Sequence, residues 1–80
     1  MNQGNIALDR VSRRFEYQQD MSNKFWEITV NGSEHTVRFG KIGKAGQTQT
    51  KTFASAAAAQ QDAARLIVEK QRKGYLEAKD

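Results

Sequence analysis

Residues 37–47 read V-R-F-G-K-I-G-K-A-G-Q, and the rest of the chain is arranged around this stretch. Apolar residues alternate along its first part. Glycines then recur at every third position, at Gly40, Gly43 and Gly46. Cations keep the same spacing, at Arg38, Lys41 and Lys44. The pattern predicts a strand that runs into a glycine-rich turn, where exposed backbone N–H groups and cationic side chains together suit a phosphate.

A basic hairpin without a ligand fits the same residues, because glycines are common in turns and lysine is a common surface residue. The stretch lacks the Walker A pattern G-x-x-x-x-G-K-[ST], and its glycine spacing differs from the dinucleotide fingerprint G-x-G-x-x-G. Between Glu34 and Asp62, however, 27 positions hold four cations and no anions. Both interpretations therefore include a local concentration of positive charge.

Composition limits the functions that we expect. The 80 residues predict one domain, and the net charge of +4 favours nucleic acid or another anionic surface as partner. Cysteine is absent and His35 is the only histidine, so we expect no disulfide, no metal and no cofactor. His35 comes just after a turn, so we expect it to be exposed and inert. No apolar run approaches the ~18 residues of a membrane span and no signal-peptide pattern occurs, so we expect a cytoplasmic protein without a membrane partner.

Alternation of apolar and polar residues predicts strands on both sides of the glycine-rich turn. Four segments fit, at residues 11–18, 25–30, 35–39 and 48–53. The second has the strongest pattern, and we expect Trp26 in the core. Asn31-Gly32 predicts a hairpin turn, because both residues tolerate a positive φ. Gly40 is expected to bend or bulge the third strand.

A helix is predicted after the strands. Ser55 is a suitable N-cap, an alanine run follows it, and Gly74 is a suitable C′ terminator. One face of the helix is traced by Ala59, Ala63, Leu66, Ile67 and Lys70. We interpret the last-turn cations Lys70, Arg72 and Lys73 as complementing the helix dipole. The chain is therefore predicted to be α+β, an antiparallel sheet of about four strands with one C-terminal helix packed on one face.

Four motifs occur in a fixed order: S-N-K-F-W-E-I at 22–28, R-F-G-K-I-G-K-A-G-Q at 38–47, K-T-F at 51–53 and L-I-x-E-K-x-x-K-G-Y at 66–75. In these motifs the chain resembles the WGR domain, whose Trp-Gly-Arg triplet here reads Phe39-Gly40-Lys41. It looks closest to bacterial members, which include stand-alone domains and proteins similar to the molybdate metabolism regulator. The domain also occurs in poly(ADP-ribose) polymerases. The resemblance covers about residues 12–76, so we expect one WGR-like domain over 1–80, with a loose arm or edge strand at 1–10.

The resemblance implies a compact sheet with one packed helix, and nucleic-acid binding without catalysis. In the polymerases the domain holds the end of a broken DNA strand, with the aromatic residue of the triplet against a terminal sugar. The positions that match its contacts are Asn23, Lys24, Phe39, Lys41, Gln47 and Tyr75. The basic turn adds Arg38 and Lys44 as candidate binding residues.

Two substitutions in the triplet predict weaker binding than in the polymerases. Phe39 keeps an aromatic face but lacks the indole N–H of tryptophan. Lys41 keeps the charge but lacks the planar fork with which arginine binds phosphate in two places. From its position alone, Phe39 fits the core as well as a ligand site, and Tyr75 fits packing at the helix end.

We therefore expect a monomeric, non-catalytic module that contacts phosphates or strand ends through its basic turn, with DNA favoured over RNA. The alternative is a protein–protein interaction module that uses an exposed sheet edge. An enzyme is not expected, because the one histidine lacks a cysteine partner and the carboxylates are scattered along the chain.

Overall fold

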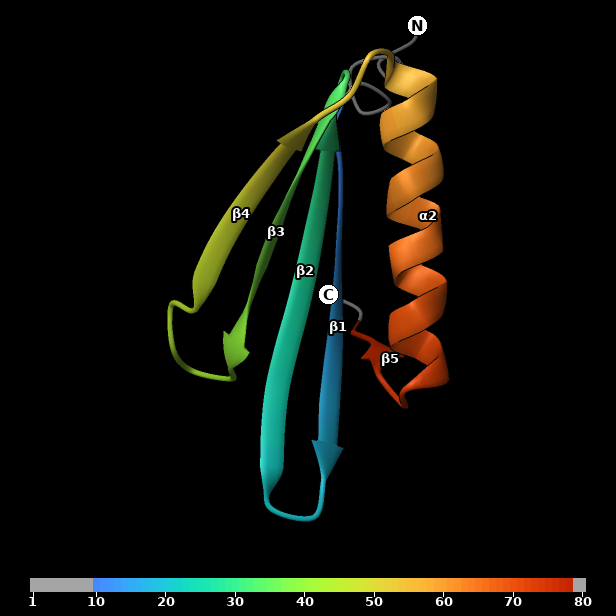
Figure 1. Ribbon diagram of the computed structural model, residues 1–80. Coiled ribbons are helices and arrows are strands. Elements are labelled where there is room, and N and C mark those ends of the chain that lie inside the picture. Colours follow the sequence, from blue (N-terminus) through green and yellow to red (C-terminus); the bar gives the residue numbers. More distant parts are fainter. Residues whose placement is uncertain (1–9, 79–80) are drawn as a thin grey trace, which may run out of the picture.

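The protein has an α+β fold, described by a computed structural model over residues 10–78 (Figure 1). The elements are, in chain order, β1 (Arg10–Gln19), β2 (Ser22–Asn31), β3 (Glu34–Lys41), β4 (Gln47–Thr52), α2 (Ala56–Arg72) and β5 (Leu76–Glu77). All five described strands pair antiparallel in one sheet of order β4-β3-β2-β1-β5. The predicted fold class is confirmed, and β5 joins the four expected strands. The arm expected at 1–10 lies outside the described residues, apart from Arg10 at the start of β1.

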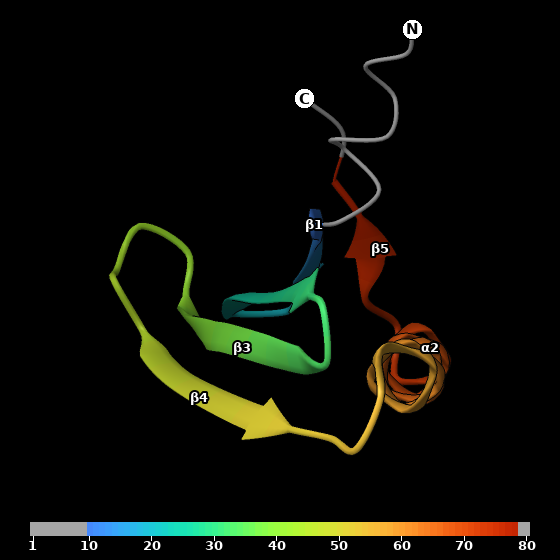
Figure 2. The same cartoon turned by 90° about the horizontal axis from the view of Figure 1, so that it is seen from above.

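The register of the strands decides which side chains meet α2. Trp26 on β2 pairs with Phe15 on β1 and with Phe39 on β3, so all three side chains point to the same face of the sheet. The helix lies along that face (Figure 2). The buried core between the two layers contains Phe15, Trp26, Ile28, Ala63 and Ile67. Trp26 is 4% exposed, which confirms its predicted place in the core.

The ends of α2 are fixed as the sequence predicts. The Ser55 hydroxyl accepts a hydrogen bond from the Ala58 N–H at 3.1 Å, which caps the first turn. At the other end Gly74 has a φ of +103°, and the Tyr75 N–H donates to the Lys70 carbonyl at 3.1 Å. This Schellman arrangement turns the chain back toward the sheet, where β5 pairs with β1. As a result, Lys70 and Tyr75 lie close together at one end of the sheet.

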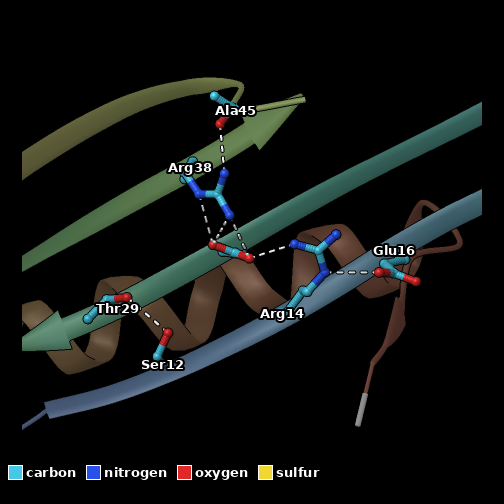
Figure 3. Close-up of polar contacts among 7 residues, drawn as sticks. Ser12, Arg14, Glu16, Thr29, Arg38 and Ala45 are labelled. Atoms are coloured by element: carbon cyan, nitrogen blue, oxygen red, sulfur yellow. Dashed lines mark hydrogen bonds and ion pairs between the residues drawn. The ribbon is translucent and has the colours of Figure 1, made fainter. Parts of the chain in front are cut away.

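The sheet face opposite α2 is polar apart from Leu76 on β5, which is exposed, and Phe25, which is 2% exposed. The guanidinium carbons of Arg14 and Arg38 lie 4.6 Å and 4.7 Å from the centre of its ring. Both arginines also bind Glu27, Arg14 at 2.6 Å and Arg38 at 3.0 Å (Figure 3). The glycine-rich turn covers the rest of the ring, because Gly46 approaches it so closely that a Cβ there would lie 3.0 Å from Phe25.

The prediction that His35 is exposed and inert was wrong. His35 is 4% exposed, its Nε2 lies 2.8 Å from Oδ2 of Asp62 on α2, and its ring centroid lies 5.0 Å from that of Phe53. The strand register explains the difference, because His35 shares its parity with Val37 and Phe39 and therefore faces the helix. His35 thus ties the start of β3 to the helix.

Candidate nucleic-acid interface

A hollow of about 550 Å³ lies where the β1–β2 turn, the end of β3 and the end of α2 meet. We call it the end hollow. Its polar and aromatic lining includes Asn23, Lys24, Phe39, Lys41, Lys70 and Tyr75. No carboxylate of the described residues lines it, although three lysines do. The end hollow is therefore suited to an anion.

Strand pairing brings two of these lysines side by side. Lys24 on β2 lies directly opposite Lys41 on β3. The hairpin continues one step past β3, because the Ile42 N–H donates to the Asn23 carbonyl at 3.0 Å. Like charges directly opposite one another in a sheet repel. A bound anion would relieve that repulsion, so the pairing favours a negatively charged ligand.

Lys70 reaches the end hollow from the helix. Its Nζ lies 5.7 Å from the ring centre of Trp26 and 5.2 Å from that of Tyr75, distances typical of cation–π contacts. Burial lowers the pKa of Lys70, and the charges of Lys73 and Lys24 lower it further. An anion in the hollow would oppose these effects, because it stabilises the charged form of Lys70.

Of the four aromatic residues that line the end hollow, Phe39 and Tyr75 are the two that are not fully buried, and they combine packing with access to the hollow. Phe39 is half-buried, packs against the core and lines the end hollow. Its position is therefore compatible both with a core residue and with a residue that faces a ligand. Tyr75 does the same at the helix end, where its ring centroid lies 5.4 Å from that of Tyr17. Aromatic rings beside lysines suit a nucleotide, since bases stack on rings while cations bind phosphate.

The structure gathers five of the eight candidate residues around the end hollow: Asn23, Lys24, Phe39, Lys41 and Tyr75. Three others lie elsewhere. Lys44 is exposed in the glycine-rich turn, and Gln47 is exposed at the start of β4, opposite Phe39 in the register. Arg38 points to the other face of the sheet, where it binds Glu27 and donates to the Ala45 carbonyl at 2.7 Å (Figure 3). Its role there is to hold the turn against the sheet.

Lys70 is the residue of the end hollow that sequence reasoning missed. The sequence placed it on the helix face that meets the sheet and interpreted its charge as complementing the helix dipole, but did not include it among the binding residues. The available signal was its place on the helix face traced by Ala63 and Ile67, which turns its side chain toward the sheet. The Schellman turn at Gly74 then brings Tyr75 beside it.

The sequence model of the WGR domain matches residues 11–80 of the chain. The chain belongs to the WGR domain family. Two relatives from Escherichia coli K12 are similar to it: Protein YehF, 46% identical over 69 residues, and the uncharacterized protein YfeS, 40% identical over 67 residues. These matches cover 85% and 84% of this WGR domain but 25% and 28% of the relatives, so the chain spans about a quarter of their length.

A crystal structure of a protein from Bacteroides fragilis has the same fold. It is 46% identical to this WGR domain, superposes with a TM-score of 0.83, and is matched over 86% of this chain and 20% of its own. Within residues 10–78, no helix is long and apolar enough to cross a membrane. The same residues contain no group of three or more His, Cys, Asp and Glu side chains that could hold a metal ion.

Proposed function

We propose that this WGR domain binds nucleic acid without catalysis, by holding a backbone phosphate in the end hollow. The observation that carries the proposal is the convergence of Lys24, Lys41 and Lys70 beside two aromatic rings, in a hollow whose described lining contains no carboxylate. Lysine is a point charge that binds phosphate without a fixed geometry. Phe39 and Tyr75 offer ring surface to the sugar or base next to that phosphate.

Sequence preference is expected to be weak. The helix α2 packs its Ala63 and Ile67 face onto the sheet, and phosphate contacts carry no sequence information. Three lysine–phosphate contacts predict that the logarithm of the binding constant falls with the logarithm of salt concentration with a slope of about −2 to −3. DNA is the proposed ligand, with its terminal 5′-phosphate as the preferred group.

The test compares Lys41, at the end of β3, with Lys44 in the turn that follows. DNA duplexes with and without a 5′-phosphate are titrated at low salt, and binding is followed by the fluorescence of Trp26, the one tryptophan of the chain. The Lys41→Gln variant is expected to bind about 10-fold more weakly, the loss typical of one hydrogen bond to a charged group. Lys44→Gln, which removes the same charge outside the hollow, is expected to change affinity less than 3-fold.

Three results would end the proposal. The first is that the wild-type protein binds no DNA at low salt. The second is that Lys44→Gln weakens binding as much as Lys41→Gln, because the interaction would then be diffuse attraction and not a site. The third is that Lys70→Gln leaves the affinity unchanged.

A second candidate function is a protein-interaction module that uses β4. This strand lies at the edge of the sheet, and all six of its residues are exposed. An open edge can pair with a strand of another protein. A partner recovered from nuclease-treated extract, and lost with a Thr50→Pro variant that still binds DNA normally, would favour this function over the first.

A further inference from the structure

A second hollow, of about 720 Å³, lies on the same face of the sheet between α2 and the strands β3 and β4. We call it the side hollow. Its apolar lining includes Val37, Phe39 and Leu66, and its polar lining includes Gln49, Lys51 and Lys70. The volume falls in the range of about 300–1,000 Å³ typical of small-molecule sites. Figure 2 shows that β4, at the edge of the sheet, lies apart from α2 along most of its length.

The two hollows are adjacent, because Trp26, Phe39 and Lys70 line both of them. A group bound to the three lysines of the end hollow therefore lies next to the side hollow. A path along β3 would lead from the cationic end hollow to the apolar floor of the side hollow.

The charges of the side hollow favour an anionic chain despite two carboxylates in its lining. Asp62 is paired with His35 and with Arg65, each at 2.8 Å, and Glu69 is paired with Arg65 at 2.8 Å. Within residues 10–78, neither Lys51 nor Lys70 lies within salt-bridge distance of a carboxylate, although Lys51 interacts with Asp62 and Lys70 with Glu69 at longer range. The lining holds three cations, Lys51, Arg65 and Lys70, against two carboxylates, so the net charge along the path is positive.

We propose that the nucleotide whose phosphate occupies the end hollow places its base, unpaired, in the side hollow. This inference rests on the proposed function and names its ligand class: a 5′-phosphorylated strand with a single-stranded overhang, in preference to a blunt duplex. The phosphate contacts the lysines, the sugar contacts Phe39, and the base packs on Val37 and Leu66. The exposed amide of Gln49 can hydrogen-bond to the edge of the base.

The experiment compares three 5′-phosphorylated DNAs: a blunt duplex, the same duplex with a three-nucleotide 5′ overhang, and that overhang made abasic. The overhang is expected to bind about 5- to 150-fold more tightly than the blunt duplex, which is the contribution of one stacked base. The abasic overhang is expected to lose that gain. It separates base binding from additional phosphate contacts, because it keeps the same charge.

Two neighbouring residues of β4 provide matched variants. Gln49 lies on the face of the side hollow, and Thr48 lies opposite Arg38 on the other face. Both are exposed, so Gln49→Glu and Thr48→Glu add the same charge without disturbing the core. Gln49→Glu is expected to reduce the advantage of the overhang at least 3-fold and to leave the affinity for the blunt duplex within 2-fold. Thr48→Glu is expected to change neither.

The outcomes separate this inference from the proposed function. If blunt and overhanging DNA bind equally while Lys41→Gln weakens both, the phosphate site stands and the inference is overturned. Equal effects of Gln49→Glu and Thr48→Glu would also overturn it, because the side hollow would then contribute no specific contact. Failure of all three DNAs to bind would overturn the inference and the proposed function together.

Discussion

Lys24 and Lys41 face each other directly across the β2–β3 pair, at the point where the two strands reach the end hollow. Two like charges in this relation cost stability, by about 0.2–1 kcal/mol. Both lysines line the end hollow, where their charges are available to a phosphate. The relation predicts that binding and stability respond in opposite directions when one of the lysines is neutralised.

The Lys41→Gln variant is expected to unfold at a higher urea concentration than the wild type, by up to about 1 kcal/mol, because the cross-strand repulsion is removed. The same variant is expected to bind DNA more weakly. Lys44→Gln is the control, since Lys44 is exposed in the turn and has no cross-strand partner in the register. A Lys41→Gln protein that is less stable than wild type would contradict the explanation and assign Lys41 a packing role.

Gly46 and Gly43 lie in the same turn, but an added side chain has different consequences at each. Gly46 has a φ of +76°, and a Cβ there would overlap the Phe39 carbonyl and lie 3.0 Å from Phe25. Gly43 has a φ of +94°, and a Cβ there would meet nothing within 4 Å. Gly43→Ala is expected to cost about 1–2 kcal/mol from backbone strain alone. Gly46→Ala should cost clearly more, and denaturant unfolding of both variants measures the difference.

The contact between His35 and Asp62 predicts a loss of stability in acid. The hydrogen bond from His35, and then that from Arg65, lower the pKa of Asp62 below its ordinary value of 3.8. A depressed folded-state pKa contributes stability that is present above pH 3.8 and is lost as the pH falls toward the folded-state value. Asp62→Asn is therefore expected to be less stable at pH 7, by about 1–3 kcal/mol. The difference from wild type should shrink below about pH 3.8.

Urea unfolding at pH 7 and at pH 3 measures this difference. Asp20→Asn is the control, because Asp20 is exposed in the β1–β2 turn, where its φ of +58° also suits asparagine. If the stability difference between Asp62→Asn and wild type were the same at both pH values, the carboxylate charge would have no part in the contact.

A variant of Arg38 tests whether the residues that hold the glycine-rich turn also bind DNA. On the sheet face opposite α2, Arg38 binds Glu27 at 3.0 Å and the Ala45 carbonyl at 2.7 Å. Arg38→Gln is expected to destabilise the fold by about 1–2 kcal/mol, through loss of hydrogen bonds to a charged group. It is expected to weaken DNA binding less than Lys41→Gln does. If Arg38→Gln lost more affinity than Lys41→Gln, the sheet face opposite α2 would take part in DNA binding.

Particular residues explain how far the sequence predicted this structure. The alternation in residues 11–18 and 25–30 and the cap at Ser55 are local signals, and the strands and helix they predict are present. The strand β5 has two residues, too few to show any period.

The binding residues were harder to predict than the fold. Cations spaced by three look like one group in the sequence, but a strand has a period of two, so Arg38 and Lys41 point to opposite faces. Lys70 lies on the helix face that the periodicity predicts, but its contact with Trp26 depends on the packing of α2 against the sheet, which is a long-range event.

Lys70 also predicts how DNA affinity depends on pH. Burial, together with the charges of Lys73 and Lys24, lowers its pKa in the free protein, so Lys70 loses its proton at a lower pH than an ordinary lysine. A bound phosphate favours the protonated form and raises that pKa. Because binding and protonation are linked, affinity is expected to fall as the pH rises through the pKa of Lys70 in the free protein. Arginine stays charged throughout, so Lys70→Arg should bind DNA with a flatter dependence between pH 7 and about pH 10. Titrations of both proteins at constant ionic strength measure the two profiles, and identical profiles would exclude Lys70 from the phosphate site.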